Sequence, residues 1–102
     1  MYKVVVTELV QGDLDSIVSY IAGQLANPTA VGHLLDEVDE CYSNLRKLPL
    51  LYELSRDNRL ATEEYHKAVI GNYVMIYKVN EATKTVTIYR FFYGPRDYTR
   101  LI

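Results

Sequence analysis

The sequence has few of the features that would tie it to a membrane, a metal or an oxidising compartment. Its 102 residues include one cysteine, Cys41, so no disulfide can form within the chain and a cysteine-rich zinc site is excluded. The longest apolar runs are far shorter than the roughly 20 residues that span a bilayer. The first residues, Met1 to Val6, lack the apolar segment and cleavage site of a signal peptide. We therefore expect a cytoplasmic protein with no membrane contact and no metal.

Standard catalytic motifs are missing as well. There is no phosphate-binding Walker loop, dinucleotide fingerprint, zinc-protease helix or serine elbow. The two histidines, His33 and His66, are far apart and lack metal-ligand spacing. His33 falls on the polar face of its helix and is interpreted as a plain surface residue. His66 falls on a mostly apolar strand face and is interpreted as a satisfied sheet residue rather than a base. Cys41 lies in an apolar helical stripe and is interpreted as a core residue, not a nucleophile.

Charge is divided unevenly along the chain, although the net charge is only −2. The first fifty residues hold three basic and seven acidic side chains, whereas the rest hold eight basic and six acidic ones. This asymmetry hints at an anionic partner for the C-terminal half. The alternative is a solvated surface of mixed charges.

The first half of the chain shows one strand pattern and two helix patterns. A β-branched run predicts a strand over residues 2–6. Apolar residues at helical spacing predict amphipathic helices over 8–26 and 28–48, the second of which begins with Asn27 as cap and Pro28 as first helical residue. The short connection between them predicts an antiparallel helical hairpin. On the stripe of the second helix, Leu34, Val38 and Leu45 are expected in the core.

The second half reads as strands after an aperiodic segment, residues 49–64, that predicts a loop. Residues 65–70 and 73–79 flank Gly71-Asn72, a two-residue hairpin signal that would pair Ile70 with Tyr73. Residues 85–93 predict a third strand. The order β-α-α-β-β-β predicts a single α+β domain over residues 1–102, with the helical hairpin packed on an antiparallel sheet.

Tyrosine is the abundant aromatic residue, with ten in the chain, six of them in the sheet half among lysines and arginines. Aromatic rings interleaved with cations on a sheet can stack nucleic-acid bases and hold phosphates. The alternative is that tyrosine simply packs well in strands, which we favour for Tyr73 and Tyr77. Tyr93 and Tyr98 bracket a Gly-Pro turn at the sheet's rim and are the better functional candidates.

Six segments carry a family resemblance across nearly the whole chain. They are Gly12-Asp13-Leu14-Asp15-Ser16-Ile17, Tyr20-Ile21, Leu25-Ala26-Asn27-Pro28, Asn72-Tyr73-Val74-Met75-Ile76-Tyr77-Lys78-Val79, Val86-Thr87-Ile88-Tyr89-Arg90 and Arg96-Asp97-Tyr98. Taken in order, they resemble the RelE/ParE superfamily of toxins, which includes proteins of plasmid-stabilisation systems. The resemblance implies the toxin of a bacterial type II toxin-antitoxin system, held inactive by a cognate antitoxin and needing no cofactor. Known family activities divide between ribosome-dependent mRNA cleavage and inhibition of DNA gyrase.

The ribonuclease members of this superfamily imply a catalytic site at the sheet's rim. The residues predicted for it are Lys67, Arg90, Tyr93, Arg96 and Tyr98. Cations would hold the charge that develops on the phosphorus centre, and a tyrosine would act as acid or base, with no metal. A tyrosine whose pKa lies near 10 is a poor base at pH 7 unless cations lower that pKa. Such members often have an arginine after the tyrosine that opens the middle strand, but here Val74 follows Tyr73.

Three functional hypotheses follow. Lys67, Arg96 and the rim tyrosines favour an mRNA interferase, an endoribonuclease that would act on mRNA at the ribosome. The missing arginine at Val74 and the acidic balance favour a non-enzymatic inhibitor of DNA gyrase of the ParE type. The third hypothesis is a catalytically inactive relative that still binds an antitoxin. In each case the cognate antitoxin is the expected partner.

Overall fold

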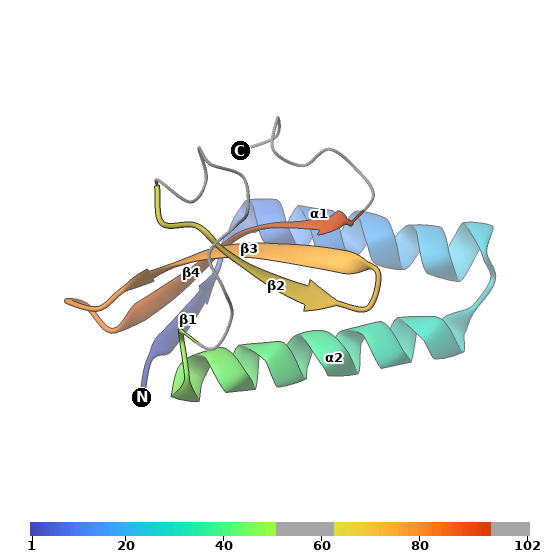
Figure 1. The fold of residues 1–102 in the computed structure, drawn as a ribbon. Coiled ribbons are helices and arrows are strands. Elements are labelled where there is room, and N and C mark those ends of the chain that lie inside the picture. Colours follow the sequence, from blue (N-terminus) through green and yellow to red (C-terminus); the bar gives the residue numbers. More distant parts are fainter. Residues whose placement is uncertain (51–62, 95–102) are drawn as a thin grey trace.

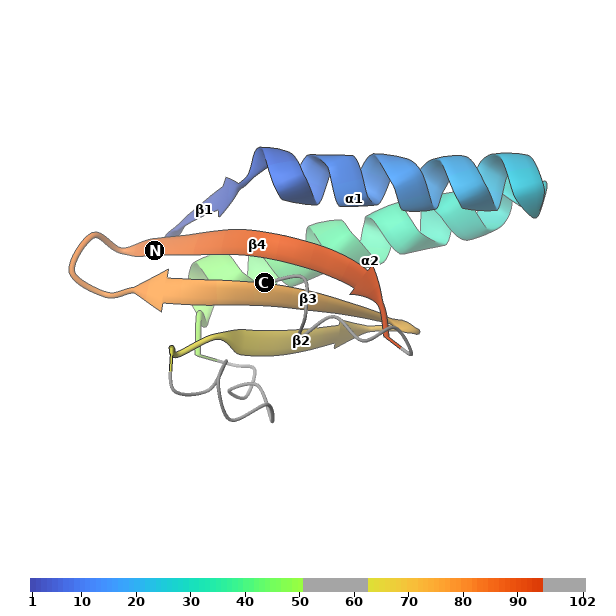
Figure 2. The same cartoon turned by 90° about the horizontal axis from the view of Figure 1, so that it is seen from above.

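A helical hairpin lies along one side of a four-stranded sheet (Figures 1 and 2) in this computed structural model, which describes residues 1–50 and 63–94. The elements are β1 (Lys3–Val6), α1 (Glu8–Ser19), the π-helical turn η1 (Tyr20–Gln24), α2 (Pro28–Lys47), β2 (His66–Ile70), β3 (Tyr73–Asn80) and β4 (Thr85–Tyr93). This is the α+β architecture expected from the sequence. No helix in the described segments is long and apolar enough to cross a membrane.

The first helix begins where the sequence predicts but changes form before its end. The Thr7 side chain accepts a hydrogen bond from the Val10 N–H and caps α1. The predicted helix over 8–26 is α-helical only to Ser19, and η1 completes it as a wider turn. A π-turn inserts extra backbone, so later side chains rotate off the apolar stripe. Leu25, expected on that stripe, is therefore 56% exposed.

The second helix follows its prediction closely. The Asn27 side chain accepts a hydrogen bond of 3.1 Å from the Ala30 N–H, and Pro28 is the first helical residue. The stripe of α2 is buried against the sheet at Leu34, Val38, Cys41 and Leu45. Cys41 is thus a core residue, as interpreted from the sequence.

The sheet is mixed rather than wholly antiparallel. Its order is β1-β4-β3-β2, and the antiparallel β2–β3 hairpin has the predicted pairing of Ile70 with Tyr73 across Gly71, whose φ is +60°. β3 and β4 are antiparallel too, but β1 pairs with β4 in parallel. The reason is that two antiparallel helices return the chain to the end where β1 started. β2 therefore runs in the direction of β1, and two further reversals give β4 the same direction.

A β-bulge separates the two ends of β4. Ile76 pairs with Arg90 and the next residue, Tyr77, pairs with Ile88, which leaves Tyr89 as the extra residue. The alternation of faces therefore shifts by one, so that Tyr89 and Arg90 both point away from the core, which includes Ile88 and Phe91. No strand pattern in the sequence indicated this bulge.

Candidate functional site

Two of the predicted site residues lie in one row on the face of the sheet turned away from the helices, here called the outer face. Lys67 on β2 pairs with Ile76 on β3, and Ile76 pairs with Arg90 on β4. Neighbouring strands are about 4.8 Å apart, so the backbones of Lys67 and Arg90 are separated by roughly 10 Å. Lys67 is half-buried, and no ion pair joins it to any residue in the described segments. This row is the part of the predicted site that the structure brings together.

The other predicted residues do not join this row. Tyr93 pairs with Tyr73, and the two rings meet edge to face with centroids 5.8 Å apart. Tyr73 also stacks on the core residue Phe91, so these tyrosines lie on the helix side of the sheet, across from Lys67 and Arg90. The physical reason is strand alternation, which puts Tyr93 on the opposite face from Phe92. Arg96 and Tyr98 lie outside the described residues.

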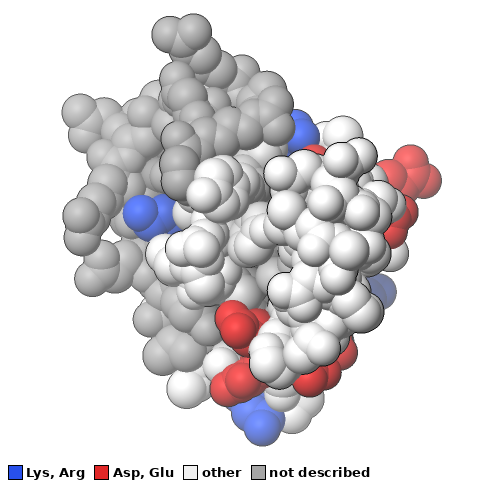
Figure 3. All heavy atoms as spheres, turned by 90° about the vertical axis from the view of Figure 1, so that its right-hand side faces the viewer, with Lys and Arg blue, Asp and Glu red and all other residues white. Residues whose placement is uncertain are grey.

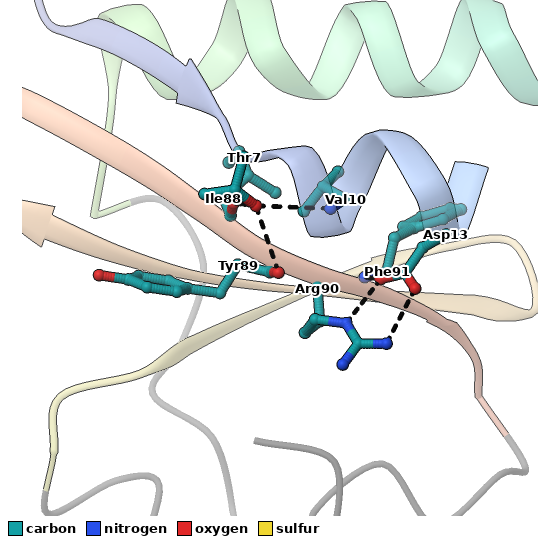
Figure 4. Close-up of polar contacts among 7 residues, drawn as sticks. All are labelled: Thr7, Val10, Asp13, Ile88, Tyr89, Arg90 and Phe91. Atoms are coloured by element: carbon teal, nitrogen blue, oxygen red, sulfur yellow. Dashed lines mark hydrogen bonds and ion pairs between the residues drawn. The ribbon is translucent and has the colours of Figure 1, made fainter. Parts of the chain in front are cut away.

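Arg90 is held by a carboxylate that the sequence did not point to. Its Nε donates to Asp13 Oδ2 at 2.8 Å and its Nη2 to Asp13 Oδ1 at 2.9 Å, a two-pronged ion pair (Figure 4). The Asp13 hydrogen bond and charge raise the pKa of Arg90, against the lowering effect of burial. The guanidinium also lies over the Phe92 ring, 4.7 Å from its centroid. Arg90 is therefore a neutralised and oriented cation.

The same carboxylate closes a gap in the sheet. β1 pairs with β4 only as far as Ile88, and within residues 1–50 and 63–94 no other strand pairs with the rest of this edge of β4. Asp13 Oδ2 accepts a hydrogen bond of 3.0 Å from the Phe91 N–H on that edge, and the Thr7 hydroxyl donates to the Ile88 carbonyl at 2.8 Å (Figure 4). Side chains at the start of α1 thus take over the pairing where β1 ends. Asp13 lies three residues after the buried Val10, on the margin of the buried helix face, but helical spacing cannot tell what it contacts.

The position of the missing arginine is filled by a buried apolar side chain. Val74 is 7% exposed. Its neighbour on the same face of β3, Ile76, is fully buried. Farther along this face Lys78 lies over the Tyr65 ring, 4.3 Å from its centroid, and Tyr65 meets Tyr89 edge to face at 5.5 Å. The β3 positions of the outer face are therefore apolar at Val74 and Ile76, and two of its cations, Lys78 and Arg90, lie beside an aromatic ring or a carboxylate.

The two histidines lie in the surroundings that the sequence predicts for them. His33 is exposed on α2. His66 is half-buried and stacks on Tyr77 with ring centroids 5.1 Å apart. His66 also lines a cavity of about 690 Å³ together with Lys78, Glu81 and Tyr89. Within the described segments, no three His, Cys, Asp or Glu side chains gather as metal ligands would.

Comparison of the sequence with known protein families identifies the family of this chain. Residues 4–98 match the model described as the ParE toxin of the type II toxin-antitoxin system parDE. The chain belongs to the ParE toxin family. No curated protein matches this chain in sequence.

Solved structures agree with this assignment in fold. A chain of the chromosomal ParDE toxin-antitoxin system from P. aeruginosa is 15% identical to this chain, with a TM-score of 0.71. The match covers 91% of this chain and 96% of the P. aeruginosa chain. A chain of the toxin-antitoxin complex RelBE2 from Mycobacterium tuberculosis is 20% identical with a TM-score of 0.64, at 90% coverage of both. A conserved hypothetical protein from Helicobacter pylori is 13% identical with a TM-score of 0.52 over the full length of both chains. At these identities the likeness is one of fold, and the ParE-family toxin shares the RelE/ParE architecture.

Proposed function

We propose that this chain is the toxin of a type II toxin-antitoxin pair and that it arrests growth by binding DNA gyrase rather than by cutting RNA. The observation that carries the proposal is the Asp13–Arg90 ion pair, which neutralises the arginine in the middle of the outer face. The match of residues 4–98 to the ParE toxin family model supports the proposal further. A cognate antitoxin is the proposed partner that keeps the toxin inactive.

The chemistry of RNA cleavage explains why the ion pair argues against a nuclease. Attack by the 2′-hydroxyl needs a base for that hydroxyl, cations for the charge developing on the phosphate, and a proton for the leaving oxygen. Asp13 takes up two of the five N–H groups of Arg90 and compensates its charge, and the carboxylate would lie beside any phosphate that the remaining N–H groups bound. Asp13 cannot easily move away, because it also holds the Phe91 N–H. Val74 offers no replacement cation.

The test is to induce the chain in bacterial cells and to follow mRNA 5′ ends and plasmid supercoiling in the same culture over the first minutes. We expect loss of negative supercoiling without new mRNA ends, and inhibition of purified gyrase by the purified chain. Lys67→Ala should remain fully toxic, because gyrase binding does not use a phosphate-binding lysine. Early mRNA cleavage with unchanged supercoiling would reject gyrase as the target.

The second candidate is a ribosome-dependent mRNA interferase. It is favoured by Lys67, a half-buried lysine on the outer face that has no ion pair within the described segments. In that case Lys67→Ala and Arg96→Ala should each lower mRNA cleavage about 10²–10³-fold, the usual effect of removing one preorganised group that stabilises a transition state. Arg96→Lys should restore only part of the activity, because the planar guanidinium is lost. Absence of both cleavage and gyrase inhibition would leave the antitoxin-binding relative as the answer.

A further inference from the structure

The strand β1 forms the edge of the sheet opposite β2, and one of its sides is free. In the part of the chain that the structure describes, β4 is the only strand that pairs with β1, and Figure 2 shows β1 at the margin of the sheet. The N–H groups of Lys3 and Thr7 donate toward β4, at 2.9 and 3.4 Å. Alternate residues of a strand bond to the same neighbour, so Val5 also bonds to β4. The N–H and C=O groups of Val4 and Val6 therefore point outward, and neither residue has another hydrogen bond to the described residues.

This free edge lacks the features that usually keep edge strands apart. Charged side chains, prolines and bulges protect exposed edges in natural sheets. Here the strand after Lys3 consists of three valines, and its pairing with β4 is regular. Val4 and Val6 pack against the core, whereas Val5, which lies between them, faces the outer side of the sheet. An uncharged and regular edge of this kind is a template for another strand.

One arrangement of two copies uses every outward group of this edge. In it, two β1 strands run antiparallel about a two-fold axis, and Val4 of each copy lies opposite Val6 of the other. Both residues have outward N–H and C=O groups, so each such pair exchanges two hydrogen bonds. Val5 then lies opposite Val5 of the other copy, and β-branched residues that face each other across strands stabilise the pairing. Other registers pair fewer of these groups, because the Tyr2 N–H is already bonded to α2 and the chain becomes helical after Thr7.

The charges beside the edge are complementary in the same register. Lys3 of one copy lies opposite Thr7 of the other and so next to Glu8, which is exposed in the first turn of α1. Glu8 in turn lies near Tyr2, whose N–H donates to the Arg46 carbonyl at 2.8 Å, at the basic end of α2. The two copies of Lys3 are four residues apart along the strands, roughly 14 Å. Two-fold symmetry repeats each attraction, and no like charges lie directly opposite one another.

Charge alone would also permit a head-to-tail arrangement. Figure 3 shows the closed end of the hairpin as mostly uncharged, with acidic side chains in its lower part, the side of α2 in Figure 1. Glu37 and Glu40 are exposed on α2, and the basic residues Arg46 and Lys47 lie in its last turn. Contact between an acidic and a basic end leaves one end of each kind free, so it forms open chains rather than a closed pair. It also leaves the outward backbone groups of β1 unused.

We propose that the β1 edge is a self-association surface, through which two copies of this chain form an antiparallel two-fold dimer with one continuous sheet. The occupant is a second copy because the outward groups, the valines and the flanking charges of β1 all match themselves under the two-fold axis. The dimer leaves β2 free, because β2 lies at the opposite edge of the sheet. Each copy contributes a strand of only four residues, so the association is weak and reversible.

Sedimentation equilibrium of the purified chain from about 10 μM to about 1 mM measures this association. We expect the apparent mass to rise with concentration from 11.8 kDa toward twice that value. Over the same range, hydrogen exchange should slow at the Val4 and Val6 amides, whereas the Val5 amide should be protected throughout. A chain that stays monomeric over the whole range, or a dimer whose Val4 and Val6 amides exchange freely, would overturn the proposal.

Val5→Lys is the most specific variant, because it places two like charges opposite each other at the two-fold axis. It should raise the Kd of the dimer at least about tenfold, whereas Val5→Thr, which keeps the branched shape, should stay within about threefold. The matched control is Val69→Lys, the same change at an exposed position of the other edge strand, which should also stay within about threefold. Circular dichroism of each variant confirms that the monomer is folded. Equal Kd values for Val5→Lys and Val69→Lys would contradict the β1 interface.

A charge exchange tests the register without altering the valines. Lys3→Glu and Glu8→Lys should each weaken the dimer at least about threefold, because each brings like charges together. The double variant Lys3→Glu/Glu8→Lys should bind more tightly than either single variant. Glu37→Lys, at the acidic end of α2, should leave the association unchanged. Loss of association in Glu37→Lys, with no recovery in the double variant, would indicate the head-to-tail contact and reject the two-fold dimer.

Discussion

At the residue scale, Asp13 is the side chain on which the described site depends most. Its two carboxylate oxygens accept three hydrogen bonds, two from Arg90 and one from the Phe91 N–H. Both partners of the ion pair are largely buried, with 20% of Arg90 and 15% of Asp13 exposed. Removing one partner from such a pair leaves the other without compensation. The contact also joins α1 to β4, so a substitution at Asp13 should change the stability of the whole fold.

Asp13→Asn should therefore lower the free energy of unfolding by about 1–3 kcal/mol, the usual effect of losing hydrogen bonds to a charged group. The measurement is chemical denaturation monitored by circular dichroism. Asp15→Asn, an exposed change two residues away on the same helix, should cost less than about 0.5 kcal/mol. Equal stability of the two variants would show that the ion pair does not hold α1 to the sheet.

Tyr42 is a second residue whose environment has a measurable consequence. Its hydroxyl oxygen is buried and has no hydrogen-bond partner within residues 1–50 and 63–94. Burial, together with Cys41 and Asp39, raises the pKa of Tyr42 from 10 to about 12. The unfolded chain then releases this proton at a lower pH than the folded chain does. The resulting loss of stability begins near pH 10 and grows up to about pH 12.

Tyr42→Phe should leave stability at pH 7 unchanged or slightly higher, because no hydrogen bond is lost and an unpaired polar group is removed. Between pH 10 and 12 the variant should lose less stability than the wild type. Thermal melts across that range check both statements. A variant that parallels the wild type above pH 10 would contradict the buried, raised pKa.

At the scale of elements, α2 is the helix whose packing the sequence defines most completely. Its buried face is the row Leu34, Val38, Cys41 and Leu45, of which Leu34 is the most exposed, at 6%. The neighbouring Leu35 is 40% exposed on the same turn. One leucine is thus part of the core and the next is not, which offers a controlled comparison of burial.

Leu34→Ala should cost about 2–5 kcal/mol of unfolding free energy, since a buried leucine leaves a cavity when it is truncated. That is a large share of the roughly 5–15 kcal/mol expected for a whole domain. Leu35→Ala should cost less than about 1 kcal/mol. The thermal midpoints of the two variants give the comparison, and an unchanged midpoint for Leu34→Ala would show that α2 does not pack on the sheet as described.

At the scale of the whole molecule, the excess of basic residues in the second half does not form one patch within the described segments. Arg90 is paired with Asp13, Lys78 lies over Tyr65, and Lys84 lies 5.1 Å from the centroid of the Tyr2 ring. These cations are spread over both ends of the sheet.

Binding of the proposed antitoxin should raise the stability of the whole molecule by mass action. At a free antitoxin concentration of 100 Kd the gain is about 2.7 kcal/mol, and the thermal midpoint should rise with antitoxin concentration. Differential scanning fluorimetry with an unrelated protein as control makes the measurement. The two proteins should also co-elute at a fixed stoichiometry, so separate elution at micromolar concentration with an unchanged midpoint would refute the pairing.

The sequence by itself determined the features that depend on neighbours along the chain. Residue spacing defined α2 and its buried face, Asn27-Pro28 defined its start, and Gly71-Asn72 defined the register of the β2–β3 hairpin. Family resemblance rested on the order of such local segments, and the family model match agrees with it. These features were predictable because caps, turns and periodic stripes act within a few residues.

Tertiary structure alone decided what depends on residues far apart in sequence. The Arg90–Asp13 pair joins residues separated by 77 positions, and the bulge at Tyr89 appears only where β4 meets β3. The parallel pairing of β1 with β4 and the separation of Tyr93 from Lys67 belong to the same class. Local patterns fix which way a side chain faces on its own element, but which group it meets depends on how the elements pack against one another.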